Sequence, residues 1–134
     1  MNEANRSENA ARESALGDDA LRAAEALVAL QLYNDAVSRA YYAAFHYARA
    51  LLLLDGLEPK THRGVFALLE RHFEATGRLS RDALSRFARL QTFRGLADYD
   101  SRDRLSAERA TEEVASARVF VDEARKASSS AAGA

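Results

Sequence analysis

Three residues within one six-residue stretch have side chains that could bind a phosphate ester. Arg94 begins the run Arg-Gly-Leu-Ala-Asp-Tyr, which ends with Asp98 and Tyr99. A guanidinium can hold a phosphate group through two parallel hydrogen bonds and can stabilise charge that develops on it. Asp98 and Tyr99 would complete a polar site around Arg94, so these three are the candidate catalytic residues.

The chemistry open to these residues is limited because no histidine stands among them. Cleavage of RNA through its 2′-hydroxyl needs a base and an acid near neutral pH, and the ordinary pKa of histidine suits both roles. Tyrosine, with an ordinary pKa of about 10, is a poor base but can donate a hydrogen bond. Arg94 and Asp98 are also four residues apart, so in a helix they could simply form an ion pair worth about 0.2–0.5 kcal/mol. Phosphate binding and a structural ion pair both remain open.

A second set of candidate binding residues lies where a helix is expected to begin. Lys60, His62 and Arg63 are close together there, and the N-H groups of a helix start can receive a phosphate. The alternative is that His62 completes the helix start and packs on the preceding helix. Arg89 is a further candidate, since residues 60–109 carry 11 basic and 7 acidic side chains that could meet an RNA backbone.

Aromatic side chains gather between residues 41 and 47. Such rings can form a stacking platform for the bases of a single strand. On a central helix, however, an aromatic cluster is more often core. We therefore predict that Tyr41 and Phe45 are buried, and that Tyr42, on the polar flank, is a candidate binding residue.

The composition excludes several classes of site. The chain has no cysteine, which excludes disulfides, thiolate metal sites and a cysteine nucleophile. The spacing of His46, His62 and His72 is not typical of a zinc site, so we expect no metal and no other cofactor. The longest wholly apolar run, residues 50–54, is too short for a membrane span, and the N-terminus lacks the pattern of a signal peptide. We expect a cytoplasmic protein that does not bind membranes.

The elements that must position these residues are expected to be helices. The chain is rich in alanine, leucine and arginine and lacks isoleucine, a composition that favours helices over strands. Apolar periodicity predicts an all-α, up-and-down bundle of about five helices, with the second helix at its centre. The expected helices cover residues 18–31, 35–54, 62–75, 80–99 and 107–126, with N-caps at Asp18 or Asp19, Asn34, Thr61 and Ser106.

The same pattern divides the chain into three parts. We expect residues 1–17 to form a flexible leader, residues 18–126 the helical bundle, and residues 127–134 a flexible tail of low complexity.

Five pieces of the sequence, in order, resemble the HEPN domain family. They are Tyr33-Asn34-Asp35-Ala36, the segment 38–45 with its Ala-Tyr-Tyr-Ala, a leucine run followed by Gly56, Lys60-Thr61-His62-Arg63-Gly64-Val65, and Arg94-Gly95-Leu96-Ala97-Asp98-Tyr99. The likeness covers about residues 19–124. It implies a small helical bundle that forms a homodimer and is often encoded beside a small nucleotidyltransferase, as a toxin and antitoxin pair.

The resemblance also implies which residues would act. Many HEPN proteins are metal-independent ribonucleases whose site resembles an arginine followed four to six residues later by a histidine. Here Arg94 matches the arginine, but Tyr99, Asp100 and Ser101 stand where the histidine is expected. The stretch looks like the Arg-x-x-Ala-Asp-Tyr variant of another branch, for which RNA or nucleotide binding is the expected function and ribonuclease activity would come from a degenerate site. A non-catalytic helical adaptor, or partner-binding protein, is the alternative.

Overall fold

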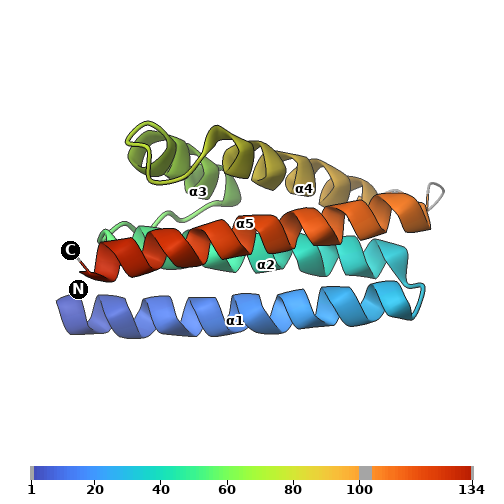
Figure 1. The fold of residues 1–134 in the computed structure, drawn as a ribbon, viewed down its shortest axis with the longest axis horizontal. Coiled ribbons are helices and arrows are strands. Elements are labelled where there is room, and N and C mark those ends of the chain that lie inside the picture. The colour runs from blue at the N-terminus through green and yellow to red at the C-terminus, as the bar shows by residue number, and fades with distance from the viewer. Residues whose placement is uncertain (1, 100–103, 134) are drawn as a thin grey trace.

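The computed structural model describes residues 2–99 and 104–133, and this part of the chain is helical, without a strand. The long helices run alternately up and down, and a short helix crosses between the second and the next (Figure 1). The elements are α1 (Glu3–Ala29), α2 (Tyr33–Leu54), α3 (His62–Leu69), a π-helical turn at Glu70–Glu74, α4 (Arg81–Tyr99) and α5 (Ala107–Gly133). The predicted all-α, up-and-down bundle is confirmed.

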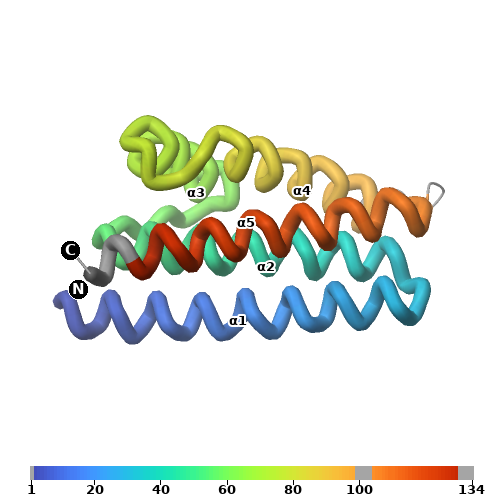
Figure 2. Tube along the Cα trace, viewed as in Figure 1, coloured from blue at the N-terminus to red at the C-terminus, as the bar shows by residue number. Residues whose placement is uncertain are grey.

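Helix α2 lies at the centre and contacts α1, α3, α4 and α5 (Figure 2). Its small residues Ala40, Ala44 and Ala48 are fully buried and let the neighbouring helices approach closely. The larger Tyr41 and Leu52 are also fully buried and fill the space between those helices. Because α2 is covered from several sides, a polar atom that it carries inside must find a partner there.

The predicted caps at Thr61 and Ser106 are confirmed, and Ser80, where a helix was expected to begin, is a third cap. The hydroxyls of Thr61, Ser80 and Ser106 each accept a hydrogen bond from the backbone N-H three residues later. Each bond satisfies a donor that the first turn of a helix leaves without an intrahelical partner. Thr61 thereby makes His62 the first residue of α3.

The other two predicted caps are wrong. Helix α1 begins at Glu3 and is capped by Asn2, so Asp18 and Asp19 lie inside it. Asn34 lies in the first turn of α2, and its side chain bonds to other parts of the chain. The sequence rule failed because an acceptor residue can equally use its side chain for tertiary contacts.

Both ends of the chain are more helical than we expected. Residues 3–17, predicted as a flexible leader, form the first half of α1, and residues 127–133 continue α5. Buried Ala10 packs with Ala50 and Leu53 of α2, which gives the first half of α1 a partner. The boundaries of the folded domain remain a prediction.

A helix that crosses a bilayer needs about 20 predominantly apolar residues. None of the described helices has a stretch that is both long and apolar enough to cross a membrane.

A close approach between α1 and α2 occurs at Gly17. A Cβ atom at this position would lie 2.5 Å from Cδ2 of Tyr47. The Tyr47 ring is held in place because its hydroxyl donates to Asp18 at 2.5 Å and accepts from Arg125 of α5 at 3.1 Å. Glycine is therefore required here for space, although it lies inside a helix.

We predict that Gly17→Ala lowers the stability of the protein by about 1–3 kcal/mol, because the added methyl group must displace the anchored Tyr47 ring. Gly95→Ala is the matched control, since a Cβ at Gly95 of α4 meets nothing within 4 Å. That control should gain about 0.5–1 kcal/mol from the higher helix propensity of alanine. Urea unfolding followed by circular dichroism measures both changes, and equal effects of the two substitutions would contradict the packing argument.

Candidate functional site

Arg94 of α4 is held by contacts with two helices. Its Nε donates to Asp98 at 2.8 Å, one turn further along α4, and its Nη2 donates to the Tyr42 hydroxyl of α2 at 2.9 Å. The guanidinium carbon lies 5.3 Å from the ring centre of Tyr41 and 5.2 Å from that of Tyr42. Among the described residues these two bonds use two of the five N-H groups of the guanidinium, so donors are left for a ligand.

His62 reaches the same two tyrosines from the start of α3. Its Nδ1 lies 2.6 Å from the Tyr41 hydroxyl oxygen. Its ring stacks on Phe45, with 4.2 Å between the ring centres and 12° between the planes, and meets the Tyr42 ring edge-on at 6.3 Å. His62 and Arg94 therefore contact one tyrosine pair from two different elements. We call Arg94, Asp98, Tyr41, Tyr42 and His62 the Arg94 cluster.

The environment sets the protonation of this cluster. Burial lowers the pKa of His62, and the positive charges of Arg94 and Arg49 lower it further, so the imidazole is neutral near pH 7. Burial raises the pKa of Tyr41 to about 12, although the charge of Arg94 opposes this rise, so Tyr41 keeps its proton. The cluster therefore holds a guanidinium, paired with the Asp98 carboxylate, beside a neutral histidine.

The structure brings together only part of the predicted site. Arg94, Asp98, Tyr42 and His62 meet, as just described. Tyr99 ends α4, but its side chain lies outside the described part of the structure.

The other candidate binding residues have different surroundings. The Nε of Arg89 donates to the fully buried carboxylate of Glu113 on α5 at 3.3 Å. Lys60 and Arg63 are exposed, and Arg63 lines a separate groove of about 340 Å³ with Phe66 and neighbouring residues of α3 and α4.

Sequence reasoning missed two contributors to the site. Tyr41 was predicted as core, and it is fully buried, but its hydrogen bond to His62 was not foreseen. Arg39 places its guanidinium carbon 5.0 Å from the ring centre of Tyr42. The spacing of Arg39 and Tyr42, three residues apart on one helix, was a signal that could have indicated this pair.

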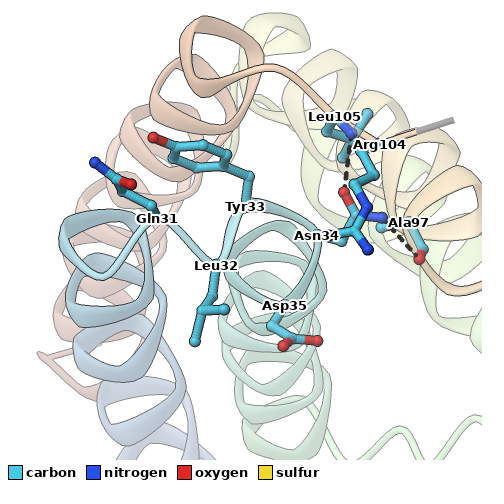
Figure 3. A pocket seen from close by; sticks show the side chains of 8 residues that line it. All are labelled: Gln31, Leu32, Tyr33, Asn34, Asp35, Ala97, Arg104 and Leu105. Atoms are coloured by element: carbon cyan, nitrogen blue, oxygen red, sulfur yellow. Dashed lines mark hydrogen bonds between the residues drawn. The ribbon is translucent and has the colours of Figure 1, made fainter.

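Asn34 helps to hold the end of α4 in place. Its Nδ2 donates to the Ala97 carbonyl at 3.4 Å, and its Oδ1 accepts from the Leu105 backbone N-H at 2.9 Å, as Figure 3 shows. These contacts lie at a pocket of about 340 Å³ that Arg104 also lines. Because Ala97 precedes Asp98, Asn34 fixes the turn of α4 that carries the partner of Arg94.

The described residues contain no group of three or more histidine, aspartate or glutamate side chains that could hold a metal ion. The Arg94 cluster itself offers hydrogen-bond donors. Arg94 contributes a charged donor, and Tyr42, whose oxygen accepts from Arg94, keeps its own hydrogen for a ligand. Such a set complements an anion.

Comparisons with known proteins agree with this fold. A family model described as HEPN domain matches residues 16–127. The protein of Methanocaldococcus jannaschii named "Putative toxin MJ0605" is 38% identical over 112 residues, which are 84% of this chain and 83% of that protein. A second one from this organism, "Putative toxin MJ0142", is 30% identical over 81% of this chain and 74% of its own length.

A relative from a different organism carries a neutral name. The "UPF0332 protein" of Archaeoglobus fulgidus is 38% identical over 72% of this chain and 76% of its own length. The family model spans most of the chain, and the relatives are similar over most of their length. On this evidence the chain is a member of the HEPN domain family.

Proposed function

We propose that this HEPN protein binds a phosphate group of RNA or of a nucleotide at the Arg94 cluster, as the toxin-type component of a toxin and antitoxin module. The observation that carries the proposal is that Arg94 lies over the rings of both Tyr41 and Tyr42, with His62 in contact with the same two rings. The toxin role is supported by membership of the family and by the names of two relatives from Methanocaldococcus jannaschii.

Charge supports a phosphate ligand rather than a neutral one. Arg39, Arg49 and Arg94 all lie over aromatic rings of α2 at or next to the cluster. Two carboxylates offset them, since Asp98 pairs with Arg94 and Glu13 lies 3.7 Å from Arg49. With His62 neutral, these five side chains together carry one positive charge, which suits the single negative charge of a phosphodiester.

The ion pair between Arg94 and Asp98, which the sequence allowed as an alternative to phosphate binding, is present. It does not account for all the contacts of Arg94. An exposed Arg-Asp pair four residues apart contributes only a few tenths of a kcal/mol, about 0.2–0.5. Here the guanidinium is also bonded to Tyr42 and held over two rings, with its side chain 21% exposed. This fixed and partly shielded position is suited to recognition of a ligand.

A ribonuclease is the second candidate function, and the position of His62 favours it. The motif histidine is absent beside Arg94 in the sequence, but α3 supplies a histidine to the same pair of tyrosines. A histidine near a phosphate-binding arginine can act as the base in cleavage through the 2′-hydroxyl only when the ring nitrogen that faces the ligand carries no proton. A non-catalytic adaptor remains the alternative if no RNA or nucleotide binds.

Two partner expectations belong to the same proposal. We propose that the protein pairs with a second copy of itself and acts with a small nucleotidyltransferase. The support for both is membership of the HEPN family. Sedimentation equilibrium of the purified chain tests the homodimer, and a monomer at micromolar concentration would contradict it.

We predict that Arg94→Ala weakens binding of a single-stranded RNA 12-mer by at least about tenfold, since a charge-assisted hydrogen bond contributes about 1.5–3 kcal/mol. Arg86→Ala is the matched control, because Arg86 lies on the same helix and bonds to an aspartate four residues away at 2.7 Å. Fluorescence anisotropy at one fixed salt concentration measures both affinities. Equal losses for the two variants would mean that only overall charge matters, and no binding by the wild type would reject the proposal.

Whether the protein cleaves RNA is tested by incubating the wild type and Arg94→Ala with mixed cellular RNA in excess EDTA. Cleavage that requires Arg94 would show a metal-independent nuclease at this site. If RNA binds but stays intact with both proteins, the function is binding alone, and gel analysis of the RNA distinguishes the two cases.

A further inference from the structure

The hydrogen bond between Tyr41 and His62 has a direction that the surroundings determine. The Tyr41 side chain is fully buried, and within the described residues its hydroxyl has His62 Nδ1 as its hydrogen-bond partner, at 2.6 Å. If Tyr41 donates to Nδ1, its buried hydrogen is satisfied. If His62 donated instead, the Tyr41 hydrogen would be left without a partner in the core, which costs about 1–3 kcal/mol. Tyr41 is therefore the donor and Nδ1 the acceptor.

This direction fixes where the neutral histidine carries its proton. A neutral imidazole has one N-H, so a ring whose Nδ1 accepts a hydrogen bond has its proton on Nε2. The low pKa of His62, caused by burial and by the charges of Arg94 and Arg49, keeps the ring in this neutral form. The stack on Phe45 at 4.2 Å holds the ring plane.

The Nε2-H group is left for an external acceptor. The two nitrogens lie on different sides of the five-membered ring, so Nε2 is directed away from Tyr41. The described residues provide no hydrogen-bond partner for it, and the residue is partly exposed. Arg94 contacts both tyrosine rings that His62 contacts, so both donors lie against the same aromatic pair.

We propose that His62 donates from Nε2 to the same phosphate group that Arg94 binds, and that Tyr41 is the positioning residue that sets the tautomer of His62. The inference rests on the proposed function and names the residue that shares the phosphate with Arg94. It has a chemical consequence. A nitrogen that already carries a proton cannot accept one from a 2′-hydroxyl, so in this tautomer His62 is a binding group and not a general base.

The first test measures the tautomer in the ligand-free protein. Long-range ¹H–¹⁵N NMR spectra of the histidine side chains at pH 7.5 should show His62 with a protonated Nε2 and an unprotonated Nδ1. In Tyr41→Phe, which keeps the buried ring, the Nδ1 resonance should shift because its hydrogen bond is lost. A proton found on Nδ1 of His62 in the wild type would overturn the inference.

The second test measures the contribution of His62 to binding. We predict that His62→Leu, which has no donor, binds a uridine 12-mer without terminal phosphate about tenfold more weakly than the wild type. His62→Gln, which keeps an amide N-H, should stay within about threefold of the wild type. Circular dichroism and the melting temperature confirm that each variant is folded. Unchanged affinity in folded His62→Leu, or no rescue by His62→Gln, would overturn the donor role.

The two possible sources of the phosphate are separated by competition. Adenosine 5′-monophosphate carries a terminal phosphate, whereas the 12-mer carries only phosphodiesters. Whichever probe binds, its affinity should fall in His62→Leu, and failure of AMP to displace the 12-mer would identify the strand as the source. The outcomes also separate the two proposals. Loss of binding in Arg94→Ala without loss in His62→Leu rejects only the role of His62. If the wild type binds neither probe, the proposed function is rejected.

Discussion

The arrangement of the site depends on a single constraint, which is that the hydroxyl of Tyr41 is carried into the fully buried centre of the bundle. A buried hydroxyl without a partner is costly, so the fold must bring an acceptor to it. That acceptor is His62, and the local sequence explains how it arrives there. Gly56, with a φ of +78°, follows the end of α2, and Thr61 caps α3 so that His62 is its first residue. The loop between α2 and α3 thus brings the imidazole of His62 back to α2.

The same tyrosine pair connects packing to electrostatics. Tyr41 and Tyr42 are consecutive on α2, and one lies in the core while the other is half-buried at its edge. Arg94 lies over both rings and bonds to the outer hydroxyl, whereas the inner hydroxyl bonds to His62. The aromatic pair is thus in contact with both a cation and a neutral imidazole. Asp98 partly offsets the charge of Arg94 but leaves some of the guanidinium N-H groups for an anion.

Much of the fold could be predicted from the sequence, because it follows from local rules. Composition indicated helices, the broad apolar surface of residues 35–54 indicated a central helix, and hydroxyl residues marked three helix starts. Asp18 and Asn34 were misread as caps, since each uses its side chain to bond to a distant part of the chain. A polar residue near an expected helix start does not reveal whether its partner is local or tertiary.

The site was predictable only in part for a similar reason. Arg94 and Asp98 could be paired from their spacing, and Tyr42 could be assigned to the polar flank of α2. The meeting of His62 with Tyr41 joins residues 21 positions apart and depends on the path of the loop between α2 and α3. The separation of Arg89 from the cluster also depends on tertiary structure, because a buried Glu113 on α5 holds that arginine. Charge counts along the sequence could not distinguish these two arginines.

The most direct test of the account is a map of ligand contact at the level of single residues. ¹⁵N-labelled protein would be titrated with a uridine 12-mer, and the Nε-Hε signal of each arginine would be followed by NMR together with the histidine side chains. The account predicts that the saturable changes are largest at Arg94 and His62 and small at Arg86 and Arg89 of the same helix. Changes confined to Arg86 and Arg89, or to the pocket beside Asn34 and Arg104, would contradict it.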